Sequence, residues 1–112
     1  MNPRRVHELM RQHFPEVKAA SRDWIVVADE HGLRTGVVRE MINEYIPAES
    51  VLVEVARKLG DFLTVDAALE FLSKHVGQAE IRVTDREFTG FLVIAVNGVA
   101  TGWTHTEGMA SK

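Results

Sequence analysis

Near the start of the chain, apolar side chains recur every three or four residues, as they do on one face of an amphipathic helix. These residues are Val6, Leu9, Met10 and Phe14. Asn2 is a favourable N-cap, Pro3 suits the first helical position, and Pro15 ends the pattern. The sequence therefore predicts a helix from Pro3 to about Phe14, whereas residues 16–22 are polar and favour no single assignment.

Two further helical stripes follow Pro47. The first is typical of a helix that ends at Gly60, and it comprises Val51, Leu52, Val55, Ala56 and Leu59. The second begins after Thr64, a suitable N-cap, and has Asp66 in its first turn, where a carboxylate complements the helix dipole. Its apolar residues precede Gly77, and they are Val65, Ala68, Leu69, Leu72 and Val76. The patterns predict two short helices between residues 48 and 76.

From Glu80 the period changes to the alternation expected of strands. Asp85 to Gly90 predicts one turn, and Asn97-Gly98 is a strong hairpin signal. A two-residue turn there would pair Val96 with Val99. It would also pair Ile94 with Thr101 and Leu92 with Trp103, which places these side chains on the face that meets the helices.

The opposite face of the central strand is also apolar, because it carries Phe91, Val93 and Ala95. A large exposed apolar patch is uncommon on a monomer, so another element has to cover it. The N-terminal helix is one candidate. A second copy of the chain is the other, which would make the protein a homodimer through this interface.

Together these elements predict an α+β fold in which a helical N-terminal two-thirds is followed by a C-terminal antiparallel three-stranded β-meander. A chain of 112 residues with 46% hydrophobic side chains suits a single domain. The expected divisions are a helical part at about 3–76, the meander at about 79–105 and a frayed tail at 106–112.

Charge and composition narrow the functional classes. The formal net charge is −3, which disfavours strong nonspecific binding to nucleic acid. The chain has no cysteine, which excludes disulfides and thiolate metal sites. Its longest apolar runs are much shorter than the roughly 20 residues that span a bilayer. We therefore expect a cytoplasmic protein that has no membrane partner.

The segment from Trp24 to Asn43 resembles the helix-turn-helix of small transcription regulators. In that motif a small residue of the first helix packs against the second, a glycine opens the turn, and apolar residues anchor the recognition helix. The matching positions are Ala28, Gly32, Leu33, Val38 and Met41. Residues 47–59 are similar to the helix that follows the motif in phage-repressor-like domains.

The resemblance implies a recognition helix that begins near Thr35 and enters the major groove. Arg39 and Asn43 would read bases, because arginine pairs with guanine and asparagine with adenine through two hydrogen bonds each. Arg34 would contact phosphate. The segment departs from the motif in three ways. Gly36 weakens the start of the recognition helix, and the carboxylates of Glu40 and Glu44 repel phosphate. Ile25 and Val26 fall on a face that is normally polar.

A β-hairpin is the alternative structure for residues 24–38. Trp24 to Ala28 is a β-branched run of strand length, Asp29 to Gly32 suits a turn, and Leu33 to Val37 can return before a helix starts. Ile25 and Val26 fit this alternative better. The choice between the two structures decides which function is favoured.

Catalytic, metal and cofactor motifs are absent from the sequence. None of the serines lies in a Gly-x-Ser-x-Gly context, and there is no phosphate loop or His-Glu-x-x-His pair. The histidines are scattered, and the Asp29-Glu30-His31 cluster is better explained as a solvated turn than as a cation site. We expect no catalytic residue, no metal and no cofactor, with Trp24 and Trp103 packed in the core.

Two functions remain. The first is a small DNA-binding regulator that uses Arg34, Thr35, Arg39 and Asn43. The second is a non-catalytic protein-interaction or accessory module with a hairpin at 24–38, whose Phe91 and Val93 face binds a partner. An enzyme ranks third.

Overall fold

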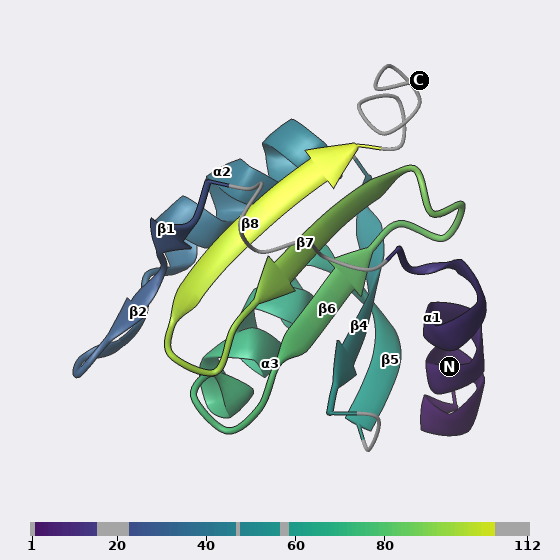
Figure 1. Ribbon diagram of the computed structural model, residues 1–112, viewed down its shortest axis with the longest axis horizontal. Coiled ribbons are helices and arrows are strands. Elements are labelled where there is room, and N and C mark those ends of the chain that lie inside the picture. Colours follow the sequence, from purple (N-terminus) through teal and green to yellow (C-terminus); the bar gives the residue numbers. More distant parts are fainter. Residues whose placement is uncertain (1, 16–22, 47, 57–58, 105–112) are drawn as a thin grey trace.

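The computed structural model describes residues 2–15, 23–46, 48–56 and 59–104 (Figure 1). Six strands form one antiparallel sheet in the order β1-β8-β7-β6-β4-β5, and β2 and β3 form a separate two-stranded hairpin. The elements in chain order are α1 (Pro3–His13), β1 (Ile25–Val26), β2 (Ala28–Asp29), β3 (Gly32–Leu33), α2 (Thr35–Tyr45), β4 (Ser50–Val55), β5 (Leu59–Thr64), α3 (Val65–His75), β6 (Ile81–Thr84), β7 (Gly90–Ile94) and β8 (Val99–Thr104).

The protein is α+β, but the predicted arrangement of a helical N-terminal two-thirds and a three-stranded meander is wrong. The meander of β6, β7 and β8 is only half of the sheet. Residues 50–64, where a helix was predicted up to Gly60, form the β4–β5 hairpin. β4 lies between β5 and β6 and is buried on both faces, so its apolar residues form a continuous run in which strand and helix periods cannot be distinguished.

The β7–β8 hairpin lies where Asn97-Gly98 predicted a turn, but its register differs by one residue. Ile94 pairs with Ala100 rather than with Thr101, and Phe91 pairs with Trp103. The connection has the three-residue form, since Gly98 has a φ of +89° and its N–H donates to the carbonyl of Ala95 at 3.0 Å. Trp103 therefore shares a face with Phe91 and not with Leu92.

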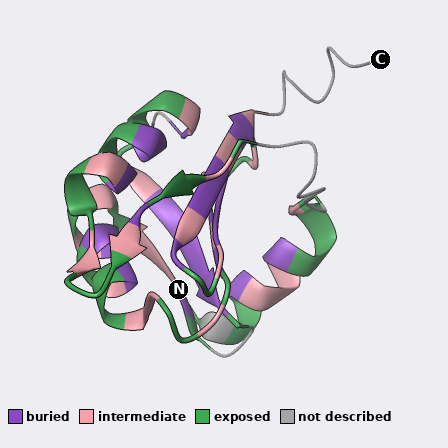
Figure 2. Cartoon of the chain, turned by 60° about the vertical axis from the view of Figure 1, so that its left-hand side comes forward, coloured by how far each residue is buried: buried purple, intermediate pink, exposed green. Residues whose placement is uncertain are grey.

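The main core lies between the sheet and the helices α2 and α3. Figure 2 shows helices that are buried toward the sheet and exposed away from it. Alternate strand residues face this layer, since a strand turns successive side chains to opposite faces. The buried strand residues of this core are Val51, Val53, Val55, Ile81, Val83, Leu92, Ile94 and Ala100.

The other face of the sheet is covered by α1 and by aromatic side chains. The helix predicted at the N-terminus is confirmed, and the side chain of Asn2 caps it by accepting from the N–H of Arg4 at 2.8 Å. Val6 and Met10 pack on Leu52, at the β4–β5 end. Nearer to β8, the buried cluster contains Phe91, Val93 and Trp103, against which Phe14, Trp24 and Phe88 pack.

The predicted helix that follows Thr64 is also confirmed as α3, and the hydroxyl of Thr64 accepts from the N–H of Ala67 at 3.3 Å. Within the described ranges, no helix has the length and apolar character needed to cross a membrane. The predicted tail at 106–112 lies outside the described residues.

Candidate functional site

Three short strands, β1, β2 and β3, lie in the described segment before α2, so this segment has no first helix. The hairpin is shorter than the one predicted at 24–38, because β1 pairs with β8, β2 pairs with β3 and α2 already begins at Thr35. The turn is built on Asp29, whose carboxylate accepts from the N–H of His31 at 2.8 Å and from Nη2 of Arg34 at 3.0 Å. Gly32 has a φ of +107°, a conformation that glycine adopts without strain. The hairpin is anchored to the sheet because the N–H of Val27 donates to the carbonyl of Gly98 at 2.8 Å.

The residues predicted to contact DNA all lie at the start or on the exposed side of α2. Thr35 and Asn43 are exposed. The two arginines are held by carboxylates, since Arg34 binds Asp29 of the hairpin and Arg39 binds Asp66 of α3. Each carboxylate offsets part of the positive charge that a DNA phosphate would otherwise meet. These ion pairs therefore give the DNA-binding hypothesis less support than the sequence did.

Two of the three residues predicted at an interface are buried within one chain. Phe91 and Val93 lie under the aromatic cluster. The ring of Phe14 meets those of Phe91 and Trp103 edge to face, with centroids 5.2 and 5.9 Å apart. Ala95 is only half-buried, and its N–H donates to the carbonyl of Val99 at 2.8 Å. The N-terminal segment thus supplies the cover that this face needs.

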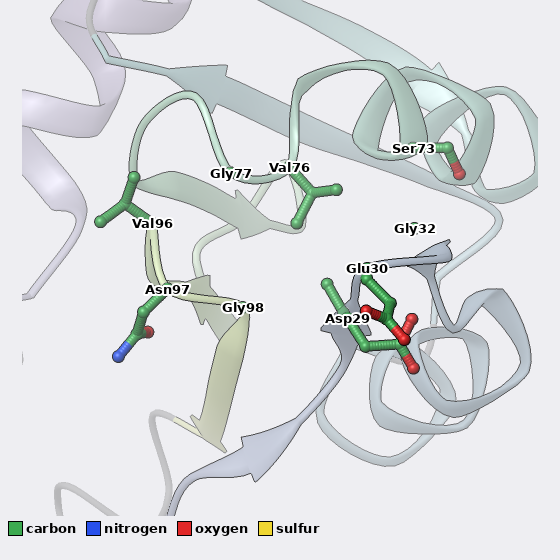
Figure 3. A pocket seen from close by; sticks show the side chains of 10 residues that line it. Asp29, Glu30, Gly32, Ser73, Val76, Gly77, Val96, Asn97 and Gly98 are labelled. Atoms are coloured by element: carbon green, nitrogen blue, oxygen red, sulfur yellow. The ribbon is translucent and has the colours of Figure 1, made fainter.

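A groove of about 350 Å³ lies where the β2–β3 hairpin, the C-terminal end of α3 and the β7–β8 turn meet (Figure 3). We call it the hairpin groove. Its lining residues are Ala28, Asp29, Glu30, Gly32, Ser73, Val76, Gly77, Val96, Asn97 and Gly98. Asp29 and Glu30 are the ionisable residues of this set, and no basic residue belongs to it. The groove is therefore acidic, and the C-terminal end of α3 adds partial negative charge.

The electrostatics of Asp29 fit a carboxylate that stays ionised. The backbone N–H of His31 and then the side chain of Arg34 lower the pKa of Asp29 below its ordinary value. Ser73 is also engaged, since its hydroxyl donates to the carbonyl of Leu69 at 2.9 Å. Among the lining residues, the charge of Asp29 is thus balanced in part by Arg34, and the Ser73 hydroxyl is bonded to the backbone rather than to a base. This arrangement suits binding better than nucleophilic catalysis.

Exposed large apolar side chains also occur near this end of the sheet. Ile25 and Val26 on β1 are 46% and 51% exposed, and Val96 in the β7–β8 turn is 55% exposed. β1 pairs with the start of β8, where Val26 lies opposite Val99, so these residues belong to one end of the sheet. We call them the apolar end. The fourth exposed large hydrophobic of the described residues is Leu59, at 41%, on the opposite edge strand β5.

Comparisons of the chain with protein-family models, with curated proteins and with solved structures gave no match. In the described part of the chain, no three His, Cys, Asp or Glu side chains lie together as metal ligands would.

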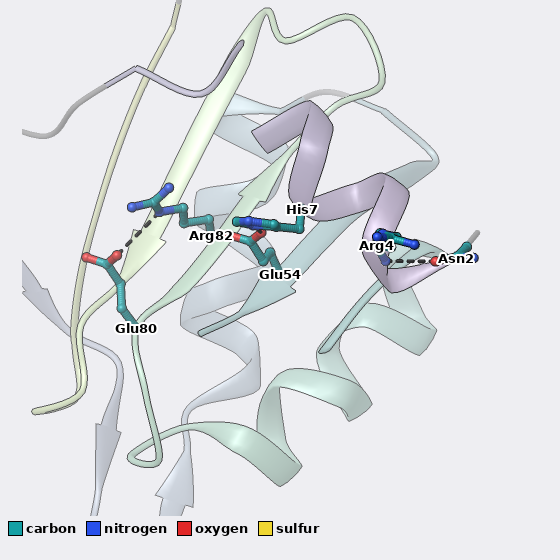
Figure 4. A network of polar contacts seen from close by, with 6 residues as sticks. All are labelled: Asn2, Arg4, His7, Glu54, Glu80 and Arg82. Carbon is teal, nitrogen blue, oxygen red and sulfur yellow. Dashed lines mark hydrogen bonds and ion pairs between the residues drawn. The ribbon is translucent and has the colours of Figure 1, made fainter. Parts of the chain in front are cut away.

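A hydrogen-bonded pair beneath α1 was not expected from the sequence. Glu54 of β4 is 3% exposed, and its carboxylate is 2.9 Å from Nδ1 of His7 on α1 (Figure 4). Arg82 lies opposite Glu54 in the ladder, but its Nε is 3.3 Å from Glu80 and its guanidinium lies over the ring of Phe14. His7 and Glu54 are 47 residues apart, so no local spacing predicts their contact.

The β6–β7 loop is held by Asp85, which accepts from the N–H groups of Thr89 and Gly90 at 2.7 and 3.0 Å and from the Thr89 hydroxyl. These bonds fix Phe88 at a φ of +57°, with its ring against His13 of α1. The loop therefore presents an aromatic side chain to the layer that covers the sheet.

We expect Asp85 to make the stability depend on acidic pH. Burial raises the pKa of Asp85, but the hydrogen bonds from Thr89 and Gly90 outweigh it, so the pKa is lower than in the unfolded chain. Such a carboxylate stabilises the fold above its unfolded pKa of about 4, and this stabilisation is lost as the pH falls through the folded value. Urea unfolding at pH 6 and at pH 3 should show a smaller difference in Asp85→Asn than in the wild type. An equal difference in both chains would contradict this role.

Proposed function

We propose that the chain is a non-catalytic protein-interaction module that binds a partner through the hairpin groove and the neighbouring apolar end. The observation that carries the proposal is the position of the exposed apolar residues. Val96 lines the groove, and Ile25 and Val26 lie on β1, the strand that pairs with the start of β8. Exposed apolar surface with a polar rim is typical of a protein-binding site.

The charge of the site indicates the chemistry of its partner. Asp29 and Glu30 line the groove, and a carboxylate beside apolar surface favours a basic group that is carried next to an apolar side chain. Glu30 is strongly exposed and its carboxylate is 3.5 Å from Nε2 of the equally exposed His31, whereas Asp29 is bound to Arg34. Glu30 is therefore the carboxylate more open to a partner. We infer that the partner is a protein segment that combines lysine or arginine with an aliphatic or aromatic residue.

Site-specific photo-crosslinking tests this proposal. A benzophenone side chain placed at Val96 should capture a discrete protein from an extract of the source cells. The same probe at Leu59 is the matched control, because Leu59 is similarly exposed but lies on the opposite edge of the sheet. We expect Glu30→Lys to reduce the yield at position 96 by about tenfold, since it places a cation where the partner's cation binds.

The same experiment can refute the proposal. If the probes at Val96 and Leu59 capture the same set of proteins, the adducts result from nonspecific association with exposed apolar side chains. If Glu30→Lys leaves the yield at position 96 unchanged, the hairpin groove does not contribute to binding.

A further inference from the structure

We propose that the sheet surface beneath α1 is a helix-binding groove which α1 occupies within its own chain, and that a second external partner, separate from that of the hairpin groove, is an amphipathic helix with the chemistry of α1. Such a helix carries two apolar side chains one turn apart and an imidazole or basic side chain next to the first. This surface is distinct from the hairpin groove, which is formed by other elements.

α1 forms a layer separate from the rest of the fold. The buried residues of the core between the sheet and the helices α2 and α3 include none from α1. The helix packs on β4 and β5 through a smaller cluster, in which Val6, Met10 and Leu52 are fully buried. Figure 1 shows α1 beside β5, at one edge of the sheet, and α2 near β8, toward the other edge. Departure of α1 would uncover Leu52 and loosen the contacts of its C-cap residue Phe14 with Phe91 and Trp103, but it would remove no side chain from the main core.

The surface beneath α1 has a shape that fits this helix. A Cβ at Gly60 would lie 2.9 Å from Cβ and Cγ1 of Val6, so the glycine provides the space that the valine fills. Leu52 and Phe62 lie on the same face of the neighbouring strands and pack in the same cluster as Val6 and Met10. A helix that binds here needs apolar side chains at the positions of Val6 and Met10.

Glu54 gives the groove its selectivity. Its buried carboxylate is held by His7, and this contact with α1 is its one partner among the described residues. An entirely apolar helix would bury this charge without a partner, which is strongly unfavourable. The groove therefore favours a helix with a cationic or N–H-donating side chain at the position of His7 and rejects apolar ones.

α1 itself is suited to exchange. It has eleven residues, and an isolated helix of this length is marginal in water. Its first turn contains Arg4 and Arg5 and no acidic residue, which is unfavourable beside the positive end of the helix dipole. Most of its stability must therefore come from docking.

Hydrogen exchange of the wild-type chain is the first test. We expect the amides of α1 to exchange on the order of 100-fold faster than those of α3, because α1 opens without unfolding the core. If α1 and α3 exchange at the same rate, α1 opens only with the whole fold and the proposal is wrong.

Binding of a helix in trans is the second test, with the full-length Val6→Asp chain and a fluorescein-labelled peptide of residues 2–15 as the probe. The aspartate should prevent α1 from docking on the sheet. The peptide should then bind to this variant at least about tenfold tighter than to the wild type, because α1 of the wild type competes at high effective concentration. A peptide with His7→Leu should bind about tenfold weaker to the Val6→Asp chain. A peptide with Gln12→Ala, changed at an exposed position, should bind like the original.

Each remaining outcome overturns the proposal. If Val6→Asp removes the exchange protection of α3, α1 belongs to the main folding unit. If α3 stays protected but the peptide does not bind, the surface is not a helix groove. If the His7→Leu peptide binds as well as the original, Glu54 does not select the occupant. If the wild type forms a dimer in which α1 is exchanged between copies, the occupant is the second copy's α1 rather than an external helix.

Discussion

A chain with Gly90→Ala will be at least about 3 kcal/mol less stable than the wild type. Gly90 is buried at the start of β7, where the C-terminal end of α2 crosses the sheet. A Cβ at this position would overlap the carbonyl oxygen of Tyr45 and lie 2.8 Å from its carbonyl carbon. These are backbone atoms, so no side-chain rotation can relieve the overlap. α2 has to move away from the sheet, and the main core opens with it.

Urea unfolding followed by circular dichroism measures this effect, and the thermal midpoint should fall by about 10 °C or more. Gly36→Ala is the matched control, because Gly36 is exposed in the first turn of α2 and a Cβ there meets nothing within 4 Å. Alanine is a better helix former, so the control should be up to about 1 kcal/mol more stable than the wild type. Equal stability of the two variants would mean that α2 does not lie this close to β7.

Glycines within the strands indicate where another element crosses the sheet closely. An isolated glycine in a strand often marks a close approach of another backbone. Gly90 and Gly102 lie on the neighbouring strands β7 and β8, and both make room for Tyr45: a Cβ at Gly102 would be 2.8 Å from Cε2 of its ring. The sequence thus indicated where a helix crosses the sheet, but not which helix.

The helix wrongly predicted between Pro47 and Gly60 shows the limit of periodicity. Val51, Val53 and Val55 face the main core, whereas Leu52 and Glu54 face α1. A strand buried on both faces loses the alternation that identifies exposed strands, and its apolar residues then also match a helical stripe. The pattern did not reveal that α1 covers the second face of β4. This covering depends on contacts between β4 and N-terminal residues that are far away in the sequence. The helices that begin after Asn2 and Thr64 were predictable because their caps are local.

The candidate site was predictable only in part. Ile25 and Val26 did not fit the helix-turn-helix pattern, and the structure exposes both of them on β1. The turn chemistry of Asp29 and Gly32 also indicated a hairpin. The hairpin groove, however, joins three segments that are far apart in the sequence, and the pairing of His7 with Glu54 spans 47 residues. Such contacts exist only after the sheet has set its register.

The second large effect is expected at that pair, where His7→Ala should lower the free energy of unfolding by about 2–3 kcal/mol. Glu54 is 3% exposed in the wild type, where His7 contacts its carboxylate, and the substitution removes this hydrogen-bond partner. The loss of stability exceeds the net contribution of one hydrogen bond, because a buried acceptor without a donor retains its full desolvation penalty. Urea unfolding at neutral pH measures the change, and Gln12→Ala, at an exposed position of the same helix, should stay within about 0.5 kcal/mol of the wild type.

The double variant His7→Leu/Glu54→Leu separates burial of charge from loss of packing. It replaces both partners by apolar side chains, and such replacements of buried ion pairs are often neutral or stabilising. We expect its stability to lie within about 1 kcal/mol of the wild type, well above that of His7→Ala. If the double variant is as unstable as His7→Ala, α1 is held by the shape of the histidine side chain and not by its pairing with Glu54. In that case, leaving the carboxylate of Glu54 unpaired would not destabilise the protein. Glu54 could then not discriminate between helices that bind in place of α1.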